Sequence, residues 1–140
     1  MNMMTLSNPI IRLTLVVVVG LVALVVAVDL GCAGPLLELL GRIPSGDKFV
    51  HFFIAGLLSL LFNLSLRGAK FRLGPAWIQW GTLAVLVVAL LEECSQRYLP
   101  HRVFSWADIA ANVAGIVCFG MLASVLLRRS AERHLEAEMA

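Results

Sequence analysis

Four long apolar stretches divide the 140-residue chain, and short segments rich in polar residues, glycine or proline separate them. The stretches cover approximately residues 10–28, 49–66, 77–98 and 107–127. A helix of roughly 20 mostly apolar residues crosses the about 30 Å of hydrocarbon in a bilayer. The pattern therefore predicts an all-α membrane protein, a bundle of four transmembrane helices.

Composition supports a bilayer as the solvent. Hydrophobic residues make up 60% of the chain and charged residues 14%, and the mean hydropathy is +0.91. Soluble domains are nearer half apolar and a quarter charged. Because the four spans use more than half of the chain, we expect a single membrane domain over residues 1–140. The net charge of +2 and the absence of a basic stripe, zinc finger or phosphate-binding glycine loop give no support for a nucleic-acid partner or a cofactor.

The first span carries Arg12 near its end, where a long cation can reach the interface. Its apolar run is longer than a usual signal-peptide core, and no small-residue cleavage site follows, so we interpret it as a retained anchor. The apolar segment over residues 35–40 is too short to cross a membrane and is expected to lie along the interface. The charged tail over residues 128–140 is expected to be a solvated helix end.

The distribution of Lys and Arg predicts the orientation. The loop after the second span, residues 67–75, carries three basic residues and no acid, and the C-terminal tail carries three arginines among mixed charges. The other two connections also hold basic residues, with acids beside them, and the positive-inside rule gives little weight to acids. Because basic loops stay in the cytoplasm, we expect both termini inside and the first and third connections outside. The basic residues that decide this are Arg67, Lys70, Arg72, Arg128, Arg129 and Arg133.

The third span brings charged groups into the membrane. Its 15 or so apolar-rich residues from Trp77 to Leu91 make roughly 22 Å of helix, less than the bilayer needs, so Glu92, Glu93 and Gln96 must enter the outer edge. Charges there are costly and are expected to turn inward and find partners. The neighbouring spans supply polar groups at the same depth. The candidate ligand-binding residues are Asp47, Lys48, His51, Glu93, Gln96, Arg102, Asp108 and Asn112.

Structural explanations exist for single members of this set. Ser105-x-x-Asp108 before an apolar run is a capping-box pattern, and Asp47 is placed to cap the second span. His51, Gln96 and Asn112 would then only tie helices together. Capping explains two carboxylates, but it leaves the remaining charges at one depth unexplained.

Small and aromatic residues also have structural explanations. A stripe of small residues at every fourth position of the last span lets helices approach closely, and the aromatic residues near the span ends are typical of the interface. The stripe is Ala107, Ala111 and Gly115, and the aromatic residues are Trp77, Trp80, Tyr98 and Trp106.

The three cysteines, Cys32, Cys94 and Cys118, have no metal-ligand spacing. Cys118 lies in an apolar run and is expected to pack there. A disulfide between Cys32 and Cys94 is an open alternative, because both are expected on the same side of the membrane.

The polar residues form an ordered set of motifs: Asp47-Lys48-x-x-His51, then Glu93-x-x-Gln96, Arg102 and Asp108-x-x-x-Asn112-x-x-Gly115. The first motif resembles the first signature of the VanZ-like family of small bacterial membrane proteins, and the others resemble the family's second signature. The resemblance covers approximately residues 47–127. His101 stands where a small residue is usual, and Glu92 adjoins Glu93 as a second acid.

The resemblance implies a setting more than a reaction. It implies a multi-pass protein of the bacterial cytoplasmic membrane and a connection with the cell envelope. The family is named after low-level resistance to the glycopeptide teicoplanin, and the molecular activity of most members is unassigned.

Our leading hypothesis is a site for a membrane lipid or a lipid-linked envelope molecule with an anionic head group. Arg102 offers a planar fork for phosphate or carboxylate, and Lys48 offers a point charge. Glu93, Asp108 and the two amides would orient these cations or bind hydroxyl groups of the ligand.

Two alternatives remain open. In the first, Glu93 and His51 serve an enzyme as acid and base, or together with Asp108 hold zinc or manganese. We predict no metal, because no motif for metal binding or nucleophilic catalysis supports this alternative. In the second, the chain is a structural partner of a larger membrane-protein complex.

Overall fold

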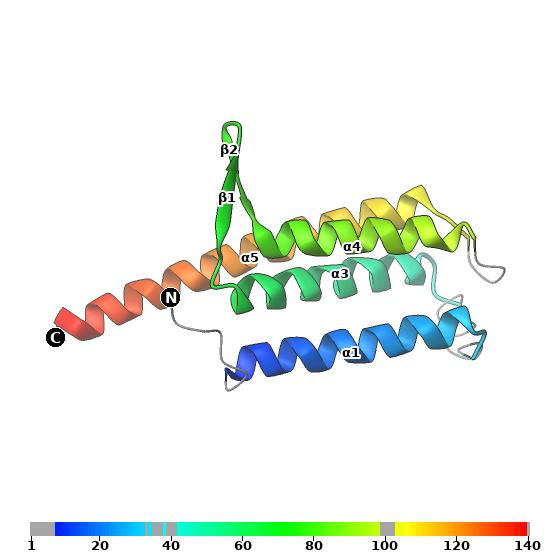
Figure 1. Ribbon diagram of the computed structural model, residues 1–140, viewed down its shortest axis with the longest axis horizontal. Coiled ribbons are helices and arrows are strands. Elements are labelled where there is room, and N and C mark those ends of the chain that lie inside the picture. Colours follow the sequence, from blue (N-terminus) through cyan, green and yellow to red (C-terminus); the bar gives the residue numbers. More distant parts are fainter. Residues whose placement is uncertain (1–7, 33, 35–37, 39–41, 99–102, 140) are drawn as a thin grey trace.

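The computed structural model describes residues 8–32, 34, 38, 42–98 and 103–139, and it consists mainly of helices lying side by side (Figure 1). The long helices are α1 (Pro9–Asp29), α3 (Gly46–Ser65), α4 (Trp80–Gln96) and α5 (Trp106–Met139). Each runs antiparallel to the one before it, so the start of α3, the end of α4 and the start of α5 meet at one end (Figure 1).

Three of these helices, α1, α3 and α5, are long and apolar enough to cross a membrane. This confirms an all-α chain with the character of a multi-pass membrane protein. The predicted first, second and fourth spans agree with these helices to within three residues, except that α5 continues to Met139. Beyond Leu127 the side chains of α5 are exposed, as expected for a solvated helix end.

The prediction of a span over residues 77–98 is wrong at its beginning. Residues Ala76–Gln79 form strand β2, which pairs with β1 (Lys70–Leu73) in a hairpin that projects from the bundle (Figure 1). Gly74 has a φ of 59° in the two-residue turn, a conformation that favours glycine. Trp77 and Ile78 suit a strand, and the turn beside them lets them pair, so α4 begins only at Trp80.

As a result α4 has 17 residues, about 26 Å at 1.5 Å per residue. It is shorter than α1, α3 and α5, the three helices that are long enough to cross a membrane. Exposed aromatic residues flank it, Trp77 and Trp80 at one end and Tyr98 and Trp106 at the other. Trp and Tyr are enriched at both membrane interfaces, so their positions suit a helix that lies between the two interfaces.

The closest packing is between α3 and α5. Gly115 faces the backbone carbonyl of Phe52, and a methyl group at this glycine would overlap with that oxygen. Ala55, Val85 and Ile116 form the apolar core where α3, α4 and α5 meet. The small-residue stripe therefore serves close helix approach at Gly115, as predicted.

Helix α1 packs mainly against α3, and the hydroxyls of Thr14 and Ser65 are hydrogen-bonded at 2.8 Å. Its outward side chains, including Val16, Val19 and Val22, are exposed. In a bilayer such an apolar surface faces lipid. Cys32, Cys94 and Cys118 are free thiols, so the alternative of a Cys32–Cys94 disulfide is not realised. The predicted interfacial segment, residues 35–40, lies outside the described residues except for Glu38.

Candidate functional site

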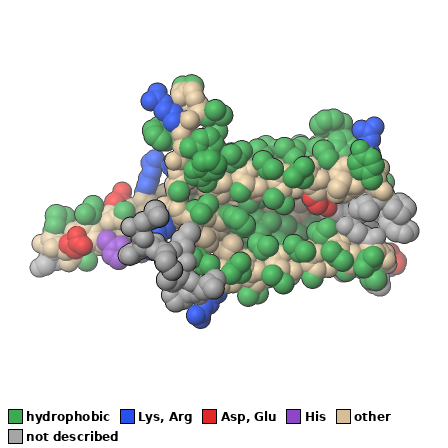
Figure 2. Space-filling view, in the orientation of Figure 1, with side chains coloured by type: hydrophobic (Ala, Val, Ile, Leu, Met, Phe, Trp, Pro, Cys, Tyr) green, Lys and Arg blue, Asp and Glu red, His purple; other side chains and the backbone are tan. Residues whose placement is uncertain are grey.

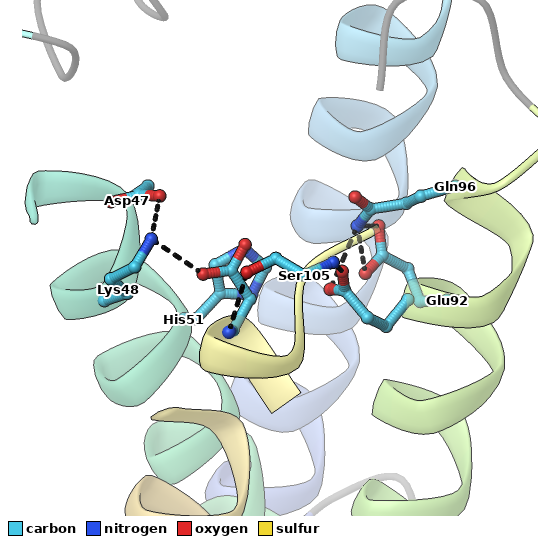
Figure 3. A network of polar contacts seen from close by, with 8 residues as sticks. Asp47, Lys48, His51, Glu92, Gln96 and Ser105 are labelled. Carbon is cyan, nitrogen blue, oxygen red and sulfur yellow. Dashed lines mark hydrogen bonds and ion pairs between the residues drawn. The ribbon is translucent and has the colours of Figure 1, made fainter. Parts of the chain in front are cut away.

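A polar cluster lies where the first turn of α3, the last turn of α4 and the first turn of α5 meet (Figure 3). We call it the end cluster. It contains Asp47, Lys48 and His51 from α3, Glu92, Glu93 and Gln96 from α4, Asp108 from α5, and Ser105, which immediately precedes α5. The antiparallel order of the helices brings these turns together although the residues are far apart in the sequence.

Asp108 joins α5 to α3 through two basic side chains. Its Oδ1 lies 3.2 Å from Lys48 Nζ, and its Oδ2 lies 3.8 Å from His51 Nε2. Lys48 also contacts the carboxylate of Asp47 at 2.5 Å. The side chain of Asp108 is 10% exposed and that of Lys48 is 37% exposed, so the pair extends from the protein interior to its surface.

Glu93 is the most deeply buried charged group of the end cluster, with no exposed surface. Its Oε1 accepts a hydrogen bond from the backbone N–H of Ser105 at 2.8 Å, and its Oε2 accepts one from Gln96 Nε2 at 3.3 Å. The same amide nitrogen donates to both oxygens of Glu92 at 3.0 Å. Each oxygen of Glu93 therefore has a donor, which offsets part of the cost of burial.

These contacts revise the capping prediction for Asp108. The backbone N–H of Asp108 donates to Ser105 Oγ at 3.3 Å, so the first half of a capping box is present. In the second half, the side chain three residues after the cap would accept from the cap's own N–H. Here Glu93, from another helix, accepts from Ser105, and the Asp108 carboxylate contacts Lys48 and His51 instead.

The prediction that Asp47 caps the second span is wrong. The N-cap of α3 is Ser45, which adopts a left-handed conformation with a φ of 58° and makes no capping bond with its side chain. Asp47 lies in the first helical turn, where a carboxylate is stabilised by the helix dipole.

Two predicted site residues have a different status. Asn112 is buried one turn further along α5 than Asp108. Arg102 lies outside the described residues, in the connection between α4 and α5. Glu92 and Ser105 also belong to the site but were not predicted from the sequence. The available signals were a glutamate beside Glu93 and the capping pattern at Ser105.

The described part of the end cluster is rich in acid. Its four acidic side chains outnumber its two basic ones. The acids are Asp47, Glu92, Glu93 and Asp108, and the basic side chains are Lys48 and His51. One ligand atom each of His51, Glu93 and Asp108 lie within 4.8 Å of one another, which is a candidate arrangement for a metal ion. Figure 2 shows acidic side chains inside a hollow of an otherwise hydrophobic face. The carboxylates of the end cluster can therefore interact with cations and with hydroxyl or amide donors.

A second polar group, which the sequence analysis missed, lies toward the other end of the bundle. Asn63 Nδ2 donates to Thr82 Oγ1 at 2.9 Å, Thr82 Oγ1 donates to Gln79 Oε1 at 3.3 Å, and Ser59 Oγ donates to the carbonyl of Ile116 at 3.1 Å. Ser59 and Asn63 are four apart in an apolar span, and this spacing was the available signal.

The chain matches no family model, no curated protein and no solved structure.

Proposed function

We propose that the protein binds the polar head group of a membrane amphiphile at the end cluster while the acyl chains remain in the lipid. The observation that carries the proposal is a set of charged groups, with Glu93 fully buried and Asp108 nearly so, at the end of an apolar bundle. Burying charge at a membrane edge is costly, and such residues usually serve a function. The hollow in the hydrophobic face (Figure 2) offers a route from the lipid.

The charges of the end cluster narrow the ligand class. Lys48 supplies one cation, and the sequence places Arg102 in the adjoining connection as a second. Four carboxylates would repel a purely anionic head group, but they accept hydrogen bonds from hydroxyl and amide donors. The best match is therefore a head group that carries both an anionic group and several donors, as a lipid-linked sugar or peptide precursor of the cell envelope does.

The orientation and the family resemblance support the same setting. The basic hairpin and the C-terminal tail lie at the end opposite the end cluster (Figure 1). By the positive-inside rule that end is cytoplasmic, which puts the end cluster at the outer face with α4 as a fourth membrane-crossing helix. A VanZ-like protein of the bacterial cytoplasmic membrane, with an effect on teicoplanin susceptibility, fits this proposal.

The test is mass spectrometry of the lipids that co-purify with the full chain after gentle solubilisation from bacterial membranes. We compare the wild type with Lys48→Ala, Glu93→Gln and Arg102→Ala, and use Glu138→Gln at the exposed end of α5 as a control for the same chemical change. A defined lipid-linked species should be retained by wild type and control and lost from the folded site variants.

Bulk membrane lipid in all proteins would overturn the proposal. If the site variants unfold whereas Glu138→Gln remains folded, the end cluster is structural. That result would favour the alternative of a small structural partner in a membrane complex.

The positions of His51, Glu93 and Asp108 favour a second candidate, a metal-dependent enzyme acting on the same type of head group. Two ligand atoms, each about 2.1 Å from one ion, lie no more than about 4.2 Å apart, so a separation of up to 4.8 Å requires the side chains to close slightly. Against a metal, Lys48 already provides a cation next to Asp108.

Metal analysis of the purified chain separates the two candidates. Zinc or manganese at one ion per chain in the wild type, lost in His51→Ala, would support the metal-dependent enzyme. Protein that retains no ion after incubation with either metal would reject it, while leaving head-group binding intact.

A further inference from the structure

The hairpin β1–β2 has two chemically different faces. Because side chains alternate along a strand and partners in register share a face, Lys70, Arg72, Trp77 and Gln79 lie on one face and Phe71, Leu73, Ala76 and Ile78 on the other. The first face carries both cations of the hairpin, and the second is wholly apolar. The hairpin projects across the direction of the helices, so it lies along the membrane plane if the bundle crosses the membrane (Figure 1).

A pocket of about 300 Å³ lies between the base of the hairpin and α5. Lys70, Trp77 and Gln79 line it from the first face and Ile78 from the second, Thr82 lines it from α4, and Met121 and Ser124 are among the residues that line it from α5. Its volume is at the small end of the range for ligand sites, about 300 to 1,000 Å³, and suits a head group. Val117 and Met121 are exposed, which leaves an apolar surface beside the pocket for an acyl chain.

Two donors of this pocket, Gln79 Nε2 and Lys70 Nζ, lack an acceptor among the described residues. Gln79 is only 8% exposed, and its Nε2 has no hydrogen-bond partner within the described part of the chain. Of the residues that the structure describes, none forms an ion pair with Lys70 and no acidic one lines the pocket. A buried donor without an acceptor costs free energy, and an uncompensated cation attracts an anion.

We propose that this pocket binds the anionic head group of a phospholipid in the leaflet opposite the end cluster. Lys70 pairs with the phosphate, the Gln79 amide and the Ser124 hydroxyl donate to its oxygens, and the acyl chains lie over Val117 and Met121. The lipid then fixes the hairpin against α5. This site is separate from the end cluster and does not depend on the ligand proposed there.

The chain offers a matched control for the charge. Arg72 is on the same strand and the same face as Lys70, but it does not line the pocket, and its Nε donates to the carbonyl of Gly74 at 3.0 Å. Lys70→Gln and Arg72→Gln each remove one positive charge from the hairpin. Only the first removes it from the pocket. Gln79→Leu removes the unpartnered donor without changing the charge.

The test is native mass spectrometry of the full chain after equilibration with vesicles of equal parts phosphatidylglycerol and phosphatidylcholine. Wild type should retain one phosphatidylglycerol molecule at this site. Lys70→Gln and Gln79→Leu should each lower its retention about tenfold or more, as expected for a lost hydrogen bond to a charged group. Arg72→Gln and Glu93→Gln should stay within about twofold of the wild type.

Equal losses in Lys70→Gln and Arg72→Gln would overturn the proposal, because they would indicate diffuse attraction to a charged surface. Equal retention of phosphatidylcholine would also overturn it. Loss in Glu93→Gln but not in Lys70→Gln would place the retained lipid at the end cluster. Lys70 is exposed, so its substitution tests the site even if Gln79→Leu does not fold.

Discussion

At the scale of single residues, the contacts of Asp108 depend on a residue of another helix. Glu93 binds the backbone N–H of Ser105, which an acid at position 108 would bind in a complete capping box. Asp108 is then available to Lys48 and His51. One hydrogen bond between α4 and the start of α5 thus decides whether a carboxylate caps its own helix or joins the end cluster.

Burial predicts that the two ion pairs of Lys48 differ in strength. Asp108 is nearly buried and Asp47 is exposed, and buried partners are screened less by water. We expect the coupling energy of Lys48 with Asp108 to be larger than that of Lys48 with Asp47. Double-mutant cycles with alanine, measured by reversible unfolding in detergent, give both values. Equal coupling energies would contradict this difference.

At the scale of elements, the contact of α3 with α5 depends on a glycine at its centre. Gly115 lies against the carbonyl of Phe52, so even a methyl group requires the two helices to separate. The wider spacing would weaken the core that Ala55, Val85 and Ile116 form. It would also draw Lys48 on α3 away from Asp108 on α5.

Gly115→Ala should therefore destabilise the protein by about 1–3 kcal/mol, the usual cost of overpacking a filled core. Gly20→Ala is the matched control, because no atom of a described residue lies within 4 Å of a methyl group added there in α1. Alanine is also the better helix former, so the control should be neutral or slightly stabilising. Thermal unfolding of both variants, measured in the same detergent, tests this difference in stability. A similar stability of the two variants would show that α3 and α5 can adjust.

At the scale of the whole molecule, two ends of different chemistry lie on opposite sides of one apolar layer. The end cluster is acid-rich, whereas the hairpin and the residues after Leu127 supply exposed basic groups. Since Lys and Arg remain in the cytoplasm, this asymmetry predicts that the end cluster faces outward. The native cysteines can report on it, because Cys32 follows α1 at the end-cluster side and Cys118 lies within α5.

In intact cells, a membrane-impermeant maleimide should label a variant that retains only Cys32 and leave a variant that retains only Cys118 unlabelled. Cys118 is exposed on the protein but is expected to face lipid, which excludes the charged reagent. Labelling is followed by gel shift before and after permeabilisation. Labelling of Cys32 only after permeabilisation would reverse the orientation and move the end cluster to the cytoplasmic side.

The apolar runs alone determined that the chain is helical and suited to a membrane. A bilayer requires segments of about 20 apolar residues whose backbone hydrogen bonds are formed within the segment. They located α1 and α3 closely, and the spacing of Asp47 and His51, and of Asp108 and Asn112, indicated shared helix faces. Sequence could not locate the start of α4. Trp77 and Ile78 suit either an apolar helix or a strand, and pairing with Phe71 and Arg72 decided for the strand.

The sequence by itself thus determined that the chain suits a lipid bilayer and where most of its helices lie. It also determined which types of residue gather at one end of the helix bundle. Only the tertiary structure decided which partner each polar group takes. Ser105 pairs with Glu93, Asp108 pairs with Lys48, and the amide nitrogen of Gln79 has no partner among the described residues. The physical reason is that membrane burial and helical period act within a segment and can be read locally. Hydrogen bonds between helices depend on distances of a few ångströms between residues far apart in the chain, and these distances are set when the helices pack.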